Sequence, residues 1–355
     1  MPISYQEPIR FEDLYHAKIW GGNELHRLLG KGDGEEKIGE SWEISVNSTE
    51  ESIIRGGLGA GRRLSEVIQE RPEEILGRNA IHGRFPLLYK FIDASDNLSV
   101  QVHPGEGSPL GDAKTETWHI VHAPPQSHLI LGLTEEAKSL QRSELLGVLS
   151  SERCEEALQK IPVQTGDTIF IPAGSVHAIT KGLVVYEVQQ DSDTTFRLYD
   201  YGRKENGKLR ELHLDQASQV IRPEAPSAKT IPIDLGSQGP FSVRILVASP
   251  YFALFELSDF KPGATLTARN HFRVLTVLAG DLQLGHPRGD TFSLGAGATT
   301  LLPAAVPELT VNASSSCKVI LSYVPDLEKD IRLPIQQKGL PESLLRGLGG
   351  VEWSG

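Results

Sequence analysis

One stretch of this 355-residue chain decides its architecture. Residues 166–177 read GDTIFIPAGSVH, and residues 297–308 read GATTLLPAAVPE, which align on the first stretch without a gap. Both stretches share a Gly-x-Thr start and a Pro-Ala pair, the pattern of a strand that enters a tight turn. The repeat predicts two related β units that differ at one informative position, where His177 of the first unit becomes Glu308 in the second.

Short apolar and β-branched runs, separated by turn residues, fill most of the chain around this repeat. We expect strands at 98–103, 116–122, 168–172, 183–189, 242–247, 273–278 and 318–324. Helical periodicity is confined to 64–76, 134–158 and, more weakly, 341–348. Strands that do not alternate with helices favour antiparallel sandwiches or barrels over a parallel sheet. The pattern therefore predicts a mainly β protein with two related antiparallel halves, each a sandwich or a barrel, and a small helical insertion.

Composition excludes several classes of protein. Asp and Glu total 46 against 35 Lys and Arg, which gives a formal net charge of −11 and argues against nucleic-acid binding. No apolar run is long enough to span a membrane or to form a signal peptide. Two cysteines are too few for a disulfide scaffold, and no glycine-rich nucleotide-binding motif occurs. We expect a cytoplasmic protein that binds neither nucleic acid nor membrane, and its oligomeric state is left open.

Three pieces of sequence together suggest a metal site. Period-2 alternation along 98–103 places Gln101 and His103 on one face of a strand. Glu116 begins another apolar strand, and the Gly-containing turn after Pro172 delivers His177 to the next strand. Each of these residues alone is more often structural or solvated. Together, an amide oxygen, two imidazoles and a carboxylate form a donor set that suits Zn²⁺, Mn²⁺, Fe²⁺ or Co²⁺.

At this point the chain resembles a known family, the cupin-fold type I mannose-6-phosphate isomerases. The resemblance covers about residues 10–215, more weakly to about 325, and is carried in family order by the stretches 20–22 (WGG), 39–45 (GESWEIS), 86–91 (PLLYKF), 98–104 (LSVQVHP), 114–116 (KTE), 166–177 and 187–197. It implies a mainly β fold of two cupin-like (jelly-roll) β-barrel halves, and one zinc ion per chain. The family pattern places that zinc on Gln101, His103, Glu116 and His177.

The resemblance also implies roles for residues around the metal. Arg197 matches a catalytic arginine at the mouth of the active site, and Glu187 and Asp193 match proposed acid/base groups. Spacing alone leaves a plain salt-bridge network equally open for these three residues. The positions that line the same cleft and are expected to bind substrate are Lys90, Ser99, Lys114 and Arg197, and Lys114 shares the acid/base candidacy. Some family members carry His where this chain has Ala113, so no mechanism that needs that histidine is transferred.

The two units are expected to differ in function, with only the first one binding metal. Residues 1–240 form the predicted catalytic, metal-binding cupin domain with a helical insertion near 134–160, and residues 326–355 form a tail. Residues 241–325 form a degenerate second cupin half, because Arg273 stands where a cupin's first motif has Glu. His271 and His286 are expected at the surface.

The predicted function is a zinc-dependent aldose–ketose isomerase that interconverts mannose 6-phosphate and fructose 6-phosphate. One alternative is a metal-dependent cupin dioxygenase, which needs no phosphate site and fits poorly with Lys90, Lys114 and Arg197. The other is a non-catalytic sugar-phosphate-binding cupin, which would be expected to lose Arg197 or a metal ligand.

Overall fold

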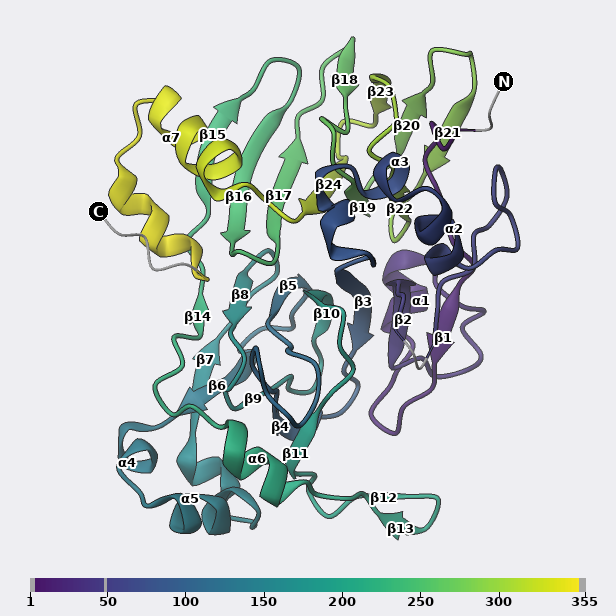
Figure 1. The fold of residues 1–355 in the computed structure, drawn as a ribbon. Helices are drawn as coiled ribbons and strands as arrows, with labels where there is room; N and C mark the ends of the chain where they lie inside the picture. The colour runs from purple at the N-terminus through teal and green to yellow at the C-terminus, as the bar shows by residue number, and fades with distance from the viewer. Residues whose placement is uncertain (1–3, 48–49, 351–355) are drawn as a thin grey trace.

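The computed structural model describes residues 4–47 and 50–350, and its architecture is mainly β (Figure 1). Two cupin-like halves follow each other along the chain, and every strand pairing within them is antiparallel. In Figure 1 the strands of the first half lie below those of the second half, which are coloured green to yellow. The predicted fold class is confirmed. No described helix is long and apolar enough to cross a lipid bilayer.

The first half contains two sheets that meet at the candidate site. The larger sheet consists, in spatial order, of β1 (Leu14–His16), β2 (Glu40–Ile44), β3 (Leu87–Asp93), β10 (Val184–Gln190), β5 (Glu116–His122), β8 (Thr168–Ile171) and β14 (Ala228–Lys229). The smaller sheet consists of β11 (Phe196–Tyr199), β4 (Val100–Val102), β9 (His177–Ala178), β6 (His128–Leu133) and β7 (Leu158–Pro162). A separate hairpin, β12 (Lys204–Glu205) and β13 (Lys208–Leu209), projects from the end of β11 (Figure 1).

The second half repeats this order of strands. Its larger sheet consists of β15 (Ile233–Ser237), β16 (Ser242–Ala248), β17 (Ala253–Ser258), β24 (Lys318–Tyr323), β19 (Arg273–Ala279) and β22 (Thr299–Leu302). Its smaller sheet consists of β18 (Ala264–Leu266), β23 (Leu309–Ala313), β20 (Leu282–Gly285) and β21 (Thr291–Leu294). By position in the sheets, β19 corresponds to β5, β22 to β8, and β24 to β10. The repeat at 166–177 and 297–308 therefore lies in matching elements.

Helices are short and lie between strands or at the end of the chain. They are α1 (Glu24–Leu29), α2 (Leu64–Glu70), α3 (Pro72–Leu76), η1 (Arg78–His82), α4 (Glu135–Lys138), α5 (Arg142–Leu149), η2 (Cys154–Ala157), α6 (Leu214–Val220), η3 (Leu327–Arg332), α7 (Leu333–Gln337) and η4 (Glu342–Leu348). The prediction of a single helix over 64–76 was wrong, because Pro72 has no amide hydrogen and starts a new helix. A single helix over 134–158 was also wrong: the segment breaks into α4, α5 and η2, and Leu158 already begins β7.

The two halves share one hydrophobic core. Tyr186 on β10 and Thr276 on β19 approach to 2.8 Å between their hydroxyl oxygens, and Ser322 on β24 donates a hydrogen bond to the hydroxyl of Tyr89 on β3. The apolar cluster around these residues includes strands from both large sheets. Burying tyrosine hydroxyls is tolerated here because each finds a partner across the boundary.

The N-terminal segment crosses that boundary a second time. Ile9 exchanges two backbone hydrogen bonds with Leu301 of β22, at 2.8 and 2.9 Å, and its carbonyl also accepts from the Thr300 hydroxyl. Phe11 pairs with Ile54 in the first half. The start of the chain is therefore held between the two halves.

Two histidines expected at the surface are buried, so that prediction was wrong. His271 is 1% exposed and His286 is 5% exposed. His271 is covered because the junction of α3 and η1, at Gly77, packs against it, and His286 is covered because it contacts the carbonyl of Gln6. In both cases the covering segment is remote in sequence.

Candidate active site

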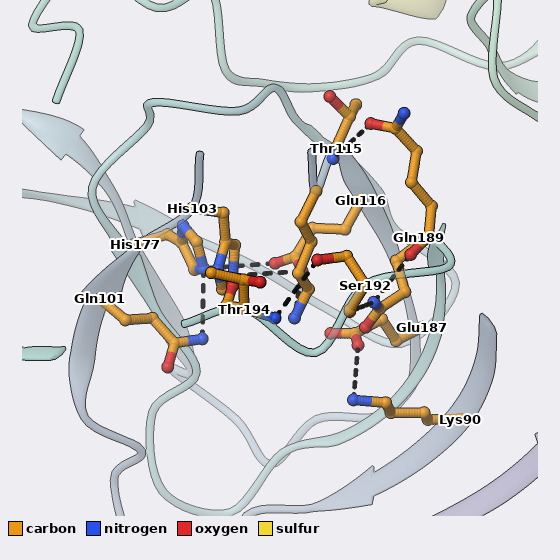
Figure 2. A network of polar contacts seen from close by, with 12 residues as sticks. Lys90, Gln101, His103, Thr115, Glu116, His177, Glu187, Gln189, Ser192 and Thr194 are labelled. Carbon is orange, nitrogen blue, oxygen red and sulfur yellow. Dashed lines mark hydrogen bonds and ion pairs between the residues drawn. The ribbon is translucent and has the colours of Figure 1, made fainter. Parts of the chain in front are cut away.

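Neighbouring strands bring the predicted metal ligands together (Figure 2). Gln101 on β4 and His177 on β9 are paired residues of one sheet, and His103 follows directly after β4. Glu116 is the first residue of β5 in the facing sheet. In Figure 2 the imidazoles of His103 and His177 and the Glu116 carboxylate point toward one another, with the Gln101 amide beside them.

The ligand atoms of three of these residues form a compact group. His103 Nε2 lies 3.5 Å from Glu116 Oε2, and His177 Nε2 lies 3.3 Å from Glu116 Oε1. The three ligand atoms of His103, Glu116 and His177 all lie within 4.8 Å of one another. The Gln101 side-chain amide is 3.3 Å from His177 Nε2, and a 180° turn of this amide would present its oxygen instead.

Backbone carbonyls fix the orientation of both imidazoles. Nδ1 of His103 lies 2.8 Å from the Thr194 carbonyl, and Nδ1 of His177 lies 2.9 Å from the Ser175 carbonyl. A carbonyl can only accept, so each Nδ1 carries the hydrogen and each Nε2 keeps a lone pair directed at the centre. Burial lowers the pKa of His177 to about 4 and that of His103 well below its usual value, so both rings are neutral at pH 7.

The residues fit a metal ion. His103 Nε2 and both oxygens of Glu116 are buried atoms that have no hydrogen-bond partner in the described chain. Leaving such atoms unpaired is costly in a protein interior, and a bound cation would satisfy all three. Neutral imidazoles and a carboxylate are also the donor set of zinc and related divalent ions.

The other predicted site residues line one cleft beside this group. The cleft has a volume of about 270 Å³, and its walls include Lys90, Ser99, Gln101, Lys114, Glu187, Asp193 and Arg197. They come from β3, β4, β10, β11 and the segments beside them. Each residue predicted to bind substrate or to act in catalysis thus lies in the same cleft.

Buried charges face each other at the inner end of the cleft. Lys114 Nζ lies 3.2 Å from Glu116 Oε2, and Lys90 Nζ lies 3.8 Å from Glu187 Oε1. Burial alone would lower the pKa of Lys114, but the carboxylates of Glu116, Glu187 and Asp193 outweigh it and raise that pKa, so Lys114 is protonated. Burial and the nearby Glu116 raise the pKa of Glu187, which also accepts a hydrogen bond from Trp118 Nε1 at 2.8 Å. A carboxyl group with a raised pKa holds its proton more readily than an ordinary carboxyl group, which suits it to proton transfer.

The cleft-wall residues that sequence reasoning missed include Lys18, Trp20, Glu40 and Arg210. Glu40 accepts from Trp42 Nε1 at 2.8 Å, and Lys18 and Lys90 lie 3.6 and 4.0 Å from its carboxylate. These cations and the hydrogen bond outweigh burial and hold the pKa of Glu40 at about 2. Trp20 and Glu40 lie within stretches that carried the resemblance, which was a usable signal. No sequence signal pointed to Arg210, because this residue reaches the cleft only through the β12–β13 hairpin.

The fold and the cleft define a small-molecule enzyme of the cupin-like class, and comparisons with known proteins agree. The family model described as "Phosphomannose isomerase type I, catalytic domain" matches residues 9–135. The mannose-6-phosphate isomerase of Streptococcus mutans is 39% identical over 255 residues, which cover 70% of this chain and 78% of that protein. A mannose-6-phosphate isomerase of Bacillus subtilis is 32% identical, with 88% of this chain and 98% of that protein covered.

A solved structure extends this similarity to three dimensions. The crystal structure of the mannose 6-phosphate isomerase from Bacillus subtilis has a TM-score of 0.79 and 30% identity, covering 90% of this chain and all of that one (100%). The phosphomannose isomerase from Salmonella typhimurium, at 15% identity and a TM-score of 0.65, shares the fold. This chain belongs to the type I phosphomannose isomerase family, and it is an enzyme.

Proposed function

We propose that this protein is a zinc-dependent aldose–ketose isomerase that interconverts mannose 6-phosphate and fructose 6-phosphate. One observation carries the metal dependence: ligand atoms of His103, Glu116 and His177 converge within 4.8 Å of one another beside a charged cleft. The names of the relatives support the choice of substrate. We assign zinc to Gln101, His103, Glu116 and His177, one ion per chain.

A bound zinc ion would polarise the oxygen atoms on C1 and C2 of the sugar and so make the C2 hydrogen more acidic. Side chains of the protein would then transfer the proton. Glu187, with its raised pKa, is placed to carry a proton between C2 and C1, and the protonated Lys114 can donate a hydrogen bond to a developing oxyanion. Asp193 shares the acid/base candidacy from the cleft wall.

The remaining cleft residues would orient the sugar. Ser99 offers a hydroxyl, and Lys90 and Arg197 offer donors whose positive charge suits an anionic substrate. A cupin dioxygenase would have no use for this charged wall. A binding protein without catalysis would have no use for a carboxyl group poised for proton transfer at the metal end.

The test is a coupled assay that converts fructose 6-phosphate into an absorbance change. We expect purified protein to isomerise mannose 6-phosphate, to lose turnover after exhaustive chelation, and to recover it when zinc is returned. Full turnover after chelation, verified by elemental analysis, would contradict the metal dependence. No turnover in zinc-loaded protein that still binds the sugar phosphate would favour the non-catalytic alternative.

A further inference from the structure

The positive charges of the cleft are unequally neutralised. The cationic side chains on its wall are Lys18, Lys90, Lys114, Arg197 and Arg210, and the anionic ones are Glu40, Glu187 and Asp193. All three lysines lie within 4.0 Å of a carboxylate oxygen of Glu40, Glu116 or Glu187. An incoming anion gains least from charges that are already paired. Arg197 has no carboxylate within 4.0 Å among the described residues. Arg210 does pair with carboxylates, Asp200 at 3.1 Å and Glu205 at 3.7 Å, but both of these lie outside the cleft wall. The two arginines are therefore the better candidates to hold a phosphate.

Arg197 has an unused hydrogen-bond donor. It lies opposite Gln101 in the β11–β4 pairing, which places it beside the candidate metal group. Its Nη1 donates to the Glu211 carbonyl at 2.7 Å, but its Nε is buried and has no hydrogen-bond partner among the described residues. Burial and the neighbouring Arg210 guanidinium lower the pKa of Arg197. Two like charges and a buried free donor are unfavourable alone, and an anion between the arginines relieves both costs.

Arg210 is held in place by a buried carboxylate. Asp200, which is 4% exposed, follows β11 and precedes the hairpin. Its Oδ1 lies 3.1 Å from Arg210 Nη1 and 2.5 Å from Arg203 Nη2. Arg203 also donates to the Asn97 carbonyl, at 2.5 Å, and so ties the base of the hairpin to the loop before β4. Arg210 Nε also lies 3.7 Å from Glu205 Oε2, so two carboxylates hold the Arg210 guanidinium while its side chain still lines the cleft.

We propose that Arg210, positioned by Asp200, binds the substrate's phosphate together with Arg197. This inference rests on the proposed function and divides the cleft into two ends. Lys90 and Lys114 then belong to the sugar and metal end, where their paired charges orient hydroxyl groups and stabilise a developing oxyanion. A phosphate dianion matches two guanidinium groups, each of which presents a planar pair of donors.

Kinetics with mannose 6-phosphate test the roles of Arg210 and Asp200. We expect Arg210→Ala to raise KM by about 10–100-fold, the usual effect of losing a hydrogen bond to a charged group, with kcat within a few-fold of wild type. Arg210→Lys should recover part of the loss, and Asp200→Asn should raise KM in the same direction because Arg210 is no longer fixed. Lys208→Ala, an exposed charge on the same hairpin, is the matched control and should leave KM unchanged.

A second measurement separates this inference from the proposed function. Calorimetric titration of zinc-loaded protein with inorganic phosphate needs no turnover, and Arg210→Ala should bind phosphate about 10-fold more weakly than wild type or worse. Unphosphorylated mannose provides an internal comparison, since its kcat/KM should be the same in wild type and Arg210→Ala. If Arg210→Ala keeps wild-type KM and wild-type phosphate affinity while mannose 6-phosphate is isomerised, the inference is overturned and the function stands. If wild type does not isomerise the sugar, the phosphate titration still decides the role of Arg210.

Discussion

Glu116 shows how the surroundings of one residue select its role. It is fully buried, at 0% exposure, yet its two oxygens have no hydrogen-bond partner and face two neutral imidazoles. Lys114 lies 3.2 Å away and offsets part of the cost of burying its charge. A buried carboxylate next to two neutral imidazoles is stabilised by a cation. The Nε2 lone pairs of His103 and His177 indicate where that cation would lie.

The repeat offers a matched pair of substitutions that tests this site. His177→Ala should remove an inner ligand, so its metal content should fall well below one ion per chain and most turnover should be lost. Glu308→Gln changes the corresponding position of the second half, where the side chain is exposed, and should keep both metal and turnover. Elemental analysis and the coupled assay measure the two quantities. Equal losses in both variants, or about two metal ions in wild type, would contradict the assignment to the first half.

Asp191 provides a pH-dependent test of stability. It is 4% exposed, its Oδ1 has no hydrogen-bond partner in the described chain, and burial raises its pKa from 3.8 to about 6. The folded protein keeps this proton up to about pH 6, whereas the unfolded chain releases it near pH 4. The contribution of protonated Asp191 to the free energy of unfolding is therefore lost as pH rises through that window.

Replacing Asp191 by Asn removes this loss. We expect the stability of Asp191→Asn, relative to wild type, to increase by up to about 3 kcal/mol between pH 4 and pH 8, which is the linkage equivalent of a two-unit shift. Urea denaturation at the two pH values measures it. Asp290→Asn, at an exposed position, is the control and should show no such trend. A stability difference for Asp191→Asn that does not change with pH would argue against the buried, protonated carboxyl.

At the level of elements, β5 and β19 show how the second half departs from the first. Both begin at the same place in their sheets, but β5 begins with Glu116 and β19 with Arg273. The Arg273 guanidinium lies 5.1 Å from the centre of the Tyr323 ring, and its Nε donates to His271 Nε2 at 3.4 Å. A fixed positive charge thus lies where the first half presents a carboxylate. This supports our proposal that residues 241–325 form a half without a metal.

Gly77, at the junction of α3 and η1, is constrained by contact with the second half. Its φ is +58°, and a Cβ added there would lie 2.3 Å from the Asn270 carbonyl oxygen and 2.7 Å from Ala304 Cβ. We expect Gly77→Ala to lower the free energy of unfolding by about 3 kcal/mol, from backbone strain together with overpacking. Gly61→Ala has a similar φ, +77°, with nothing within 4 Å, and should cost only about 1 kcal/mol. Equal costs for both in urea denaturation would mean that the contact with Asn270 contributes nothing.

Local patterns predicted the elements whose neighbours in sequence determine them. The strand over 116–122 was placed at its observed bounds, because a short apolar and β-branched run and the following turn define it. The helix expected over 134–158 failed because its breaks depend on how α4, α5 and β7 pack on the sheet. His271 and Arg210 were misjudged or missed for a similar reason: a remote segment covers the first, and a hairpin carries the second to the cleft. The four predicted metal ligands were brought together because the family pattern already encodes long-range pairing.

At the level of the whole molecule, the candidate site and the second half are connected by packing. Tyr89 and Tyr186 lie on β3 and β10, the same strands that carry Lys90 and Glu187 into the cleft, and their hydroxyls contact Ser322 and Thr276. Side chains alternate along a strand, so one face serves the site and the other packs against the second half. The second half thus supports the strands from which the site is built. The division of the chain at residue 240 remains our proposal for its domains.

The pairing of Ile9 with Leu301 has a consequence for how the protein is made. A segment near the start of the chain reaches its place only after β22, close to the end of the chain, has left the ribosome and folded. Contacts of such long sequence separation slow folding, because a large loop must close before they form. Until then the first half would expose the face of its large sheet that β19 and β24 later cover. We therefore expect this face to be open to chaperones, and to aggregation, while the chain is being synthesised.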